Sequence, residues 1–446
     1  MRTQRAATLL ALLDLPRVGP KTVWDALTRE GATLESAAAA VAARVPGGAA
    51  RLAAALPARA AAVARAQDLG LEVLTVLGPG YPAVLAFGPL PPPPVLFVRG
   101  RLPRRLRADH VNELASVGVV GTRSATSAGL QEARALGAAL ADAGAVVVSG
   151  LALGIDGAAH RGALDAARRN AGTAPTVAVL GGAHDRLHPQ AHARLAEAIV
   201  AAGGAVISEH PPGTSPRPAS FLRRNRIIAA LSHVLVVVEA GARSGALDTV
   251  DHAGRLGRDV LTIPARPSDR RRAGNLALLR GKAKVLVDLT DLAVHLASVE
   301  RVAAALTAMA ATGAPLVPAP GAPPLPVPAA DDGSALEAAG PASASPRAAT
   351  GPGALAEPSP AGPGAAATAT PPSPRRGSLP PVGYGCLRVL AALARGGDAS
   401  FDGLLARLTR SGARRRPTPA ELAGCLVRLE LAGCLVRAED GRYRAA

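Results

Sequence analysis

Positively charged side chains crowd one short stretch of the chain, from Ser220 to Ser232, with the sequence SFLRRNRIIAALS. Its apolar second half predicts a buried helix with Ser220 as the N-cap. Arg223, Arg224 and Arg226 would then lie in the first turns, where each cation opposes the helix macrodipole by about 0.3–1 kcal/mol. We therefore expect these arginines either to pair with carboxylates of the same chain or to bind an anion from outside.

Ser149, Asp156 and His160 are of the types that nucleophilic catalysis uses. Asp156 and His160 are four residues apart at the start of a predicted helix, a spacing that permits a hydrogen bond. Yet the chain has no G-x-S-x-G motif to present a serine, no Walker A motif, no dinucleotide-binding glycine motif and no cluster with metal-ligand spacing. We predict no catalytic residue, no metal, no cofactor and a structural role for Asp156, so that the protein is not an enzyme.

The formal net charge of the 446-residue chain is +17, from 50 basic and 33 acidic residues. This excess favours an anionic partner, nucleic acid above all. Lysine occurs only at Lys21, Lys282 and Lys284, however, and alanine is abundant, which is typical of GC-rich genomes, where arginine replaces lysine for codon reasons. Charge alone therefore leaves both explanations open.

The three cysteines, Cys386, Cys425 and Cys434, form no disulfide or metal framework and fit a reducing compartment. The apolar run near the N-terminus is broken by Asp14 and Pro16, so we predict no signal peptide. No uninterrupted apolar stretch of about 20 residues predicts a membrane span. We expect a cytoplasmic protein without a membrane partner.

Short apolar segments alternate with amphipathic segments from about residue 110 to 295. Continuous apolar strands separated by helices indicate a parallel sheet that is covered on both faces. We predict an α/β fold in which residues 76–300 form a Rossmann-like doubly wound parallel sheet. The expected strands are 95–100, after a proline-rich run, and then 116–121, 145–150, 176–182, 205–209, 233–240 and 259–265.

The turns that follow these strands contain most of the unusual residues of the domain. Ligands of doubly wound sheets bind beyond the carboxyl ends of the strands, and glycine-rich turns there bind anions. Glycine is common in any tight turn, so the gathering of arginines on one rim is the stronger signal. The candidate binding residues of these turns are Arg123, Ser149, Gly150, Arg223, Arg224, Asn225, Arg226, Ser244 and Gly245.

The two ends of the chain differ from this central pattern. Residues 1–75 are rich in alanine and leucine and predict a helical domain, in which Leu13 to Gly31 resembles a helix-hairpin-helix (or SAM-like) turn. Such a turn can offer N–H groups to phosphate, although a small helical bundle more often serves packing alone. Residues 301–380, mainly proline, alanine, glycine and serine, predict a disordered linker.

Residues 381–446 predict a second folded domain. Thr418 to Glu421 is a capping box before a helix, and CLVRAEDGRYRA predicts a hairpin with an Asp-Gly turn. Helices followed by a hairpin are typical of a winged helix. The heptapeptide LAGCLVR occurs at 422–428 and again at 431–437, and we expect the first copy in the helix and the second to become a strand.

Five motifs in order, GTRSATSAG, SGLALGIDGAAHRGAL, VAVLGGAHDRLHP, FLRRNRIIAALS and VVVEAGARSGALDT, resemble the bacterial DNA-processing protein A family, DprA or Smf. The resemblance is close over about 115–265. It implies a single-stranded DNA-binding recombination mediator of natural transformation that protects incoming strands and loads the RecA recombinase. It also implies a homodimer formed through the Rossmann-like domain, and DNA contacts from Arg123, Arg223, Arg224 and Arg226.

The chain departs from the family pattern in places. His188-Pro189 replaces a usual Tyr-Pro, Pro264-Ala265 replaces a common Pro-Gly, and the segment after the last strand adds Arg270, Arg271 and Arg272, which we expect to add a basic contact. Aromatic residues make up only 2% of the chain. Base stacking must therefore be sparse, with Phe221 and Tyr81 as the nearest candidates.

Two alternatives remain. The first is an enzyme similar to nucleotide phosphoribohydrolases, which have a related scaffold with a PGGxGTxxE signature after a late strand. Here Glu239 precedes the glycine instead of following it, which misplaces a catalytic carboxylate. The second is a structural protein whose arginines pair internally, with Glu209, Glu239 and Asp248 as partners.

Overall fold

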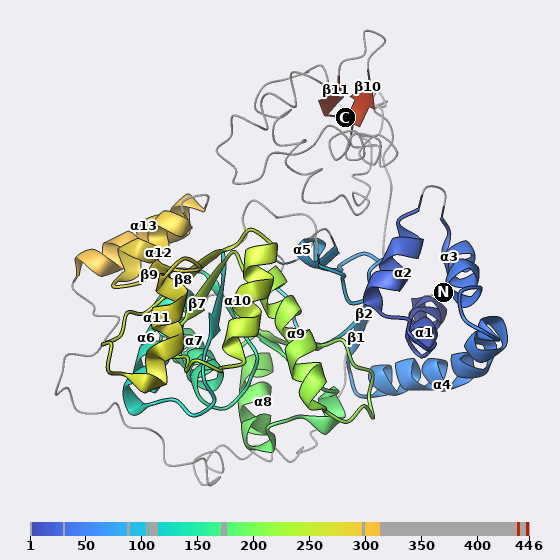
Figure 1. Ribbon diagram of the computed structural model, residues 1–446, viewed down its shortest axis with the longest axis horizontal. Helices are drawn as coiled ribbons and strands as arrows, with labels where there is room; N and C mark the ends of the chain where they lie inside the picture. Colours follow the sequence, from blue (N-terminus) through green and yellow to red (C-terminus); the bar gives the residue numbers. More distant parts are fainter. Residues whose placement is uncertain are drawn as a thin grey trace, which may run out of the picture. The chain divides into compact units, whose positions relative to one another are not determined.

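The computed structural model describes residues 2–29, 32–86, 90–103, 106, 115–170, 176–296, 299–312, 435–437 and 443–445. Figure 1 shows the arrangement of their helices and strands. Most of the predicted linker, and the predicted winged helix apart from its hairpin strands, lie outside the described residues. None of the helices within these ranges is long and apolar enough to cross a membrane.

A nine-stranded sheet forms the centre of the described fold, in the order β1-β2-β6-β5-β4-β3-β7-β8-β9. All seven strands that the sequence predicts are present, several of them a few residues shorter. Their burial on both faces explains the continuous apolar runs. The strands are β1 (Glu72–Thr75), β2 (Val95–Gly100), β3 (Ser116–Val120), β4 (Val146–Ser149), β5 (Thr176–Val179), β6 (Ala205–Ser208), β7 (Val234–Val237), β8 (Asp259–Thr262) and β9 (Lys284–Val285).

The strands from β6 to β9 in this order pair in parallel, as predicted. The expectation of a wholly parallel sheet is wrong at one edge, where β2 pairs antiparallel with both β6 and β1. The helical region also ends earlier than expected. Gly70 has a φ of 70°, after which the chain turns away from the helix and enters β1. This turn is available because glycine tolerates the left-handed conformation.

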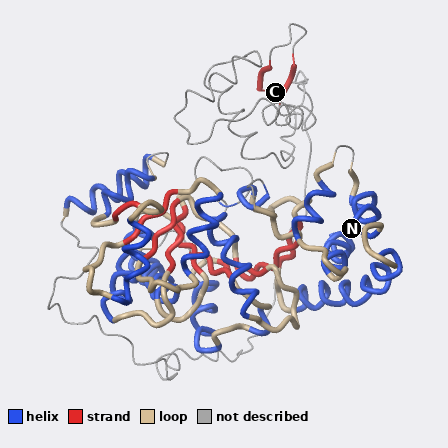
Figure 2. Tube along the Cα trace, viewed as in Figure 1, coloured by secondary structure: helices blue, strands red, loops and turns tan. Residues whose placement is uncertain are grey.

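Helices cover both faces of the sheet, as Figure 2 shows. One face packs against α6 (Ser127–Asp142), α7 (Ile155–Arg169), α12 (Leu289–His295) and α13 (Glu300–Ala311). The other face packs against α5 (Ala83–Ala86), α9 (Pro218–Leu231), α10 (Ala246–Arg255) and α11 (Ala273–Leu279). Successive residues of each strand point to opposite faces, so that Val147 joins the first core and Val146 and Val148 join the second.

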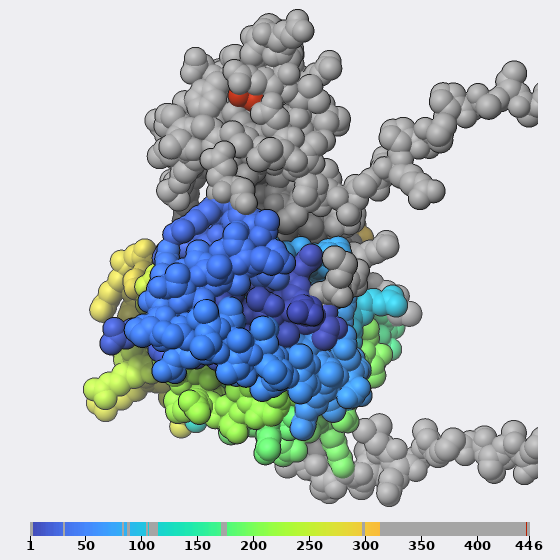
Figure 3. Space-filling model, turned by 90° about the vertical axis from the view of Figure 1, so that its right-hand side faces the viewer, coloured from blue at the N-terminus to red at the C-terminus, as the bar shows by residue number. Residues whose placement is uncertain are grey.

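Four helices, α1 (Arg2–Leu13), α2 (Pro20–Leu27), α3 (Leu34–Ala42) and α4 (Gly48–Asp68), precede the sheet, as the pattern predicts. Their core includes Val95 and Phe97 of β2, which ties them to the antiparallel edge. Figure 3 looks onto the surface of these N-terminal residues, coloured blue. No contact in the structure tests the predicted phosphate binding by the turn before α2.

The C-terminal part of the chain corrects one boundary and confirms one element. Helix α13 occupies the first residues of the segment expected to be linker, because Val302 and Leu306 are fully buried against the sheet domain. Strands β10 (Leu435–Arg437) and β11 (Tyr443–Ala445) pair antiparallel, which confirms the predicted hairpin strands. Because β10 lies within the second LAGCLVR copy, the prediction that this copy becomes a strand is also confirmed.

Candidate functional site

A pocket of about 740 Å³ opens at the carboxyl ends of β3 and β7. These neighbouring strands mark the point where the order of the sheet reverses, since the chain continues from β3 to β4 on one side and from β7 to β8 on the other. Ligands of open α/β sheets bind at such a point. The lining residues are Val120, Gly121, Thr122, Arg123, Ala152, Asp156, His188, Pro216, Arg217, Pro218, Phe221, Leu222, Arg224, Asn225, Ile228, Ser244, Gly245, Ala246 and Thr249.

Helix α9 supplies more lining side chains than any other helix, but it begins earlier than predicted. Pro218 occupies its first position, where a fixed φ and a missing N–H suit a helix start, and Arg217 is the N-cap. The prediction of Ser220 as N-cap is therefore wrong. Arg223, Arg224 and Arg226 lie beyond the first turn, where the macrodipole has largely faded, so the expected electrostatic penalty does not apply.

Arg224 is buried at the pocket, with 4% of its surface exposed. Its Nη1 donates to the carbonyl oxygens of Gly150 (2.6 Å) and Val179, while its Nε is buried without a partner. Burial lowers the pKa of Arg224 to about 10, and the nearby Asp156 carboxylate partly opposes this shift. The guanidinium thus stays charged at neutral pH and is held in one orientation.

Gly150 makes this position possible. A Cβ at residue 150 would overlap the guanidinium of Arg224. Its N–H donates to Oδ2 of Asp156 (3.1 Å), which also accepts from the N–H of Ala152 (3.4 Å). Asp156 therefore organises the turn after β4, in agreement with the predicted structural role, and burial raises the pKa of its carboxyl.

A serine–histidine relay is not assembled by Ser149 and His160. Ser149 Oγ donates to the carbonyl of Val119 (2.6 Å), and His160 Nδ1 pairs with Oγ1 of Thr176 (2.8 Å). Burial lowers the pKa of His160 to about 3, so the ring is neutral. These contacts support the rejection of a nucleophilic triad. Within the described ranges, no group of histidine, cysteine and carboxylate side chains is placed to hold a metal ion.

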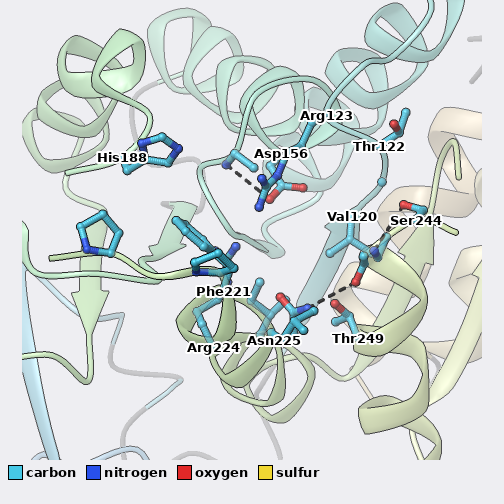
Figure 4. A pocket seen from close by; sticks show the side chains of 18 of the residues that line it. Val120, Thr122, Arg123, Asp156, His188, Phe221, Arg224, Asn225, Ser244 and Thr249 are labelled. Carbon is cyan, nitrogen blue, oxygen red and sulfur yellow. Dashed lines mark hydrogen bonds between the residues drawn. The ribbon is translucent and has the colours of Figure 1, made fainter. Parts of the chain in front are cut away.

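Arg123, Phe221 and His188 form a cluster at the pocket. The Cζ of Arg123 lies 5.2 Å from the centroid of the Phe221 ring, and the His188 ring lies 5.6 Å from it at 60°. Figure 4 shows His188 and Phe221 on one side of the pocket and Ser244 and Thr249 on the other. The prediction of Tyr81 as a second stacking residue is wrong, because its side chain is buried and its hydroxyl donates to the carbonyl of Pro93 (2.6 Å).

The remaining predicted arginines differ in their environment. Arg226 is buried in a two-point ion pair with Glu209 (2.7 and 3.2 Å), one of the internal partners foreseen, and it does not line the pocket. Arg223, which directly precedes Arg224 in α9, is exposed and also does not line the pocket. The structure therefore brings only Arg123 and Arg224 of the four arginines to the pocket.

The other predicted site residues fall into two groups, those that line the pocket and those that do not. Asn225, Ser244 and Gly245 line the pocket, and Asn225 Nδ2 joins α9 to α10 by donating to Gly245 (3.3 Å) and to Oδ2 of Asp248 (3.1 Å). Ser149 and Gly150 lie behind the lining, where they hold the strand end and Arg224 in place.

Among the lining residues that were not chosen as candidates from the sequence, two have basic side chains, Arg217 and His188. Arg217 is exposed at the N-cap of α9, and its signal was a basic residue between two prolines directly before the predicted helix. His188 was noted only as a departure from a family pattern, although it lies at the end of a glycine-rich turn. No pattern in the sequence indicates that Arg217 or His188 lies close to Phe221 in the fold.

Comparison with known proteins gives a consistent match. The family model for DNA recombination-mediator protein A matches residues 72–297. Protein Smf of Synechocystis sp. is 39% identical over 233 residues, which cover 52% of this chain and 56% of that protein, about half its length. DNA processing protein DprA of Bacillus subtilis is 32% identical over 230 residues, 52% of this chain and 73% of that protein.

A solved structure shows the same similarity. The X-ray structure of DNA processing protein A from Streptococcus pneumoniae aligns with a TM-score of 0.50 at 27% sequence identity. The alignment covers 63% of this chain and 94% of that one. The strands β1 to β9 and the lining residues of the pocket lie within the residues that the family model matches.

Proposed function

Because the chain belongs to the DNA recombination-mediator protein A family, we propose that it binds single-stranded DNA and acts as a recombination mediator in natural transformation. In this role it protects incoming strands and loads the RecA recombinase, without being an enzyme. The strongest support is the pocket at the switch point, which the buried Arg224 lines together with the Phe221–Arg123 cluster. A phosphate and a base are the two groups that such a pair of features suits.

The geometry of the pocket suits a DNA strand that is bound irrespective of its nucleotide sequence. Arg224 is oriented by two carbonyl oxygens before any ligand arrives, which reduces the ordering cost of binding an anion. Arg123 and Arg217 are exposed at the same pocket and add positive charge for neighbouring phosphates. The ring of Phe221 offers a stacking surface, which in single-strand binders contributes about 1–3 kcal/mol per base.

The proposed contacts come from the residues that line the pocket or lie next to it. Asn225, Ser244 and Gly245 also line the pocket. Arg223 is exposed one position from Arg224 and is proposed to contact the strand outside the pocket. Arg226, Ser149 and Gly150 are proposed as positioning residues, since each makes internal contacts.

The enzymatic alternative has little support in this geometry. Glu239 is fully buried, accepts hydrogen bonds from the N–H and hydroxyl of Thr126, and does not line the pocket. Internal pairing explains Arg226 but not Arg123, for which the structure gives no carboxylate partner among the described residues. Homodimerisation through the Rossmann-like domain belongs to the same proposal and is measurable by light scattering.

Fluorescence anisotropy with a labelled single strand of about 30 nucleotides tests the proposal. Binding is measured from low to high salt, with the matching duplex as competitor. Arg123→Glu is the informative variant, because the Arg123 side chain is exposed and its loss removes no internal hydrogen bond. Arg168→Glu is the matched control, since Arg168 is exposed near the C-terminal end of α7, away from the pocket.

Binding that prefers the single strand, weakens with salt and falls at least about tenfold in Arg123→Glu, equal to about 1.4 kcal/mol, would support the proposal. The control should retain affinity close to that of the unchanged protein. A folded protein that binds no single strand at low salt would refute it. Release of ribose phosphate from a nucleoside monophosphate would support the enzymatic alternative instead.

A further inference from the structure

We propose that a second basic surface, formed by Arg243, Arg270 and Arg271, binds the phosphate backbone of nucleotides that leave the pocket. The strand would continue from the pocket along the carboxyl edge of the sheet towards β8. This inference rests on the proposed single-stranded DNA binding and specifies where the strand runs. It concerns the segment after β8 in which the sequence adds three consecutive arginines.

The second basic surface is attached to a loop that also borders the pocket. The N–H of Gly274 donates to the carbonyl of Ala240 (2.8 Å), and Oδ1 of Asn275 accepts from the N–H of Ala240 (2.8 Å). Asn275 also donates to the carbonyls of Val238 and Ile263. The segment after β8 is thereby held against the start of the loop that follows β7.

The same loop then reaches the pocket within a few residues. A Cβ at Gly274 would lie 2.7 Å from the carbonyl oxygens of Ala240 and Gly241, so the two backbones are in close contact. From Gly241 the loop passes Arg243 and arrives at Ser244 and Gly245, which line the pocket. This short loop therefore contains Arg243 of the second basic surface as well as two pocket residues, and its start contacts the segment of Arg270 and Arg271.

The side chains of Arg243, Arg270 and Arg271 are exposed. None of them makes a side-chain hydrogen bond or an ion pair with another described residue. The acid nearest in sequence to Arg270 and Arg271 is Asp269, which accepts from the N–H of Arg271 (2.9 Å) and lies 3.9 Å from Arg272. Its carboxylate is thus used to cap the turn and leaves the exposed guanidinium groups available to an external anion.

Arg272 differs from its neighbours and explains their orientation. It is buried, pairs with Glu132 (2.5 Å) and lies 4.0 Å from Glu239. Residues Arg270–Arg272 form the 3-10 turn η5, in which three successive side chains point in different directions. With Arg272 turned inward, Arg270 and Arg271 are directed to solvent on a fixed backbone.

A fixed set of exposed arginines without carboxylate partners suits a polyanion. Phosphodiester groups bind arginine through charge-assisted hydrogen bonds, and each contact releases counterions. A strand whose bases occupy the pocket has further phosphates on either side of it. Arg243 directly precedes Ser244 and Gly245, and Arg270 and Arg271 belong to the segment that bonds to the start of the same loop, so these arginines are near enough to the pocket to bind such phosphates.

The test compares the double variant Arg270→Ala/Arg271→Ala with the unchanged protein on two labelled single strands, of about 6 and about 30 nucleotides. Arg168→Ala/Arg169→Ala is the matched control, since it also removes two adjacent exposed arginines. They end α7, whose N-terminus adjoins the carboxyl edge, and so lie towards the opposite edge of the sheet. Anisotropy is recorded over a range of salt concentrations, and thermal melting checks that each variant is folded.

We expect the double variant to bind the short strand as the unchanged protein does and the long strand about tenfold more weakly. The slope of log affinity against log salt for the long strand should fall by about 1.4, because each lost phosphate contact contributes about 0.7. Unchanged affinity and slope for the long strand would overturn the inference, and so would equal weakening for both strands. If the unchanged protein bound neither strand, the proposed function itself would have failed.

Discussion

Arg224 and Arg226 are two residues apart in α9, yet their guanidinium groups make different kinds of contact. Arg226 forms a buried ion pair with Glu209, whereas Arg224 donates to two carbonyl oxygens and lines the pocket. The buried Arg224 is thus both a structural residue and a proposed ligand contact. Arg123, which is exposed and packs only on Phe221, has no such structural role.

A pair of alanine variants separates the two roles. Arg224→Ala leaves the carbonyls of Gly150 and Val179 without their donor, and we expect it to lower the free energy of unfolding by about 1–3 kcal/mol. Arg123→Ala should change that free energy by less than about 0.5 kcal/mol. Both should weaken DNA binding. Urea denaturation measures the difference, and equal stability of the two variants would contradict the buried contacts of Arg224.

The buried His160 predicts a dependence of stability on pH. Burial lowers its pKa to about 3 from 6.5, so the folded state holds the ring neutral while the unfolded state binds a proton below pH 6.5. This stabilisation is complete above pH 6.5 and is lost as the pH falls towards 3. Each pH unit in that window costs about 1.4 kcal/mol.

His160→Gln removes this titration and is the variant to compare. Free energies of unfolding from urea denaturation, measured at several pH values between 6.5 and 4.5, should fall less steeply in the variant than in the unchanged protein, by about 1.4 kcal/mol per pH unit. Each protein serves as its own reference across pH, so any constant loss of stability in the variant cancels. Identical pH slopes would show that His160 is not held neutral.

Among the elements, α9 and α13 show how packing sets boundaries. Pro218 begins α9 early and moves the arginines away from the helix end. Helix α13 belongs to the folded sheet domain because Val302 and Leu306, four residues apart, face the core beside α6 and α12. The burial of these two side chains is what places α13 with the sheet domain.

Leu306→Ala tests the place of α13 in the sheet domain. Removal of a fully buried leucine should cost about 2–5 kcal/mol, from the lost transfer free energy and the cavity that remains. Thr307→Ala is the neighbouring control, because Thr307 is exposed and bonds only within the helix. Melting temperatures measure both. A loss no larger than that of the control would mean that α13 is not packed as described.

At the scale of the whole molecule, the net charge of +17 should govern how fast a DNA strand arrives. Long-range attraction raises association rates and is screened by salt, while the short-range contacts in the pocket determine dissociation. We expect the association rate for a single strand to fall steeply with ionic strength and the dissociation rate to change less. Stopped-flow fluorescence measures both rates.

The double variant Arg168→Ala/Arg169→Ala provides the control for this prediction, because it lowers the net charge without touching the pocket. It should slow association modestly and leave dissociation unchanged. Arg123→Ala should mainly speed dissociation. If association were independent of salt, the excess charge would reflect codon usage and not DNA steering.

Local patterns in the sequence determined the strands, the order of the motifs and the edge of the sheet at which the pocket opens. Continuous apolar runs can be satisfied only by burial on both faces, and parallel strands place their following turns at one edge. The same reasoning located Arg123, Arg224, Asn225, Ser244 and Gly245 correctly at the pocket. It did not reveal the antiparallel edge, because β1 lies in a segment that was predicted to be helical and the apolar run of β2 does not indicate the direction of the strand.

Only the tertiary structure decided which arginines line the pocket and which pair with other residues of the chain. Arg224, Arg226 and Arg272 are all arginines in basic runs, and nothing in their spacing distinguishes a pocket residue from an internal partner. Their roles depend on groups from other elements, such as Val179 for Arg224, Glu209 for Arg226 and Glu132 for Arg272. A guanidinium becomes structural or available to a ligand according to which distant acceptor the fold brings within hydrogen-bond distance.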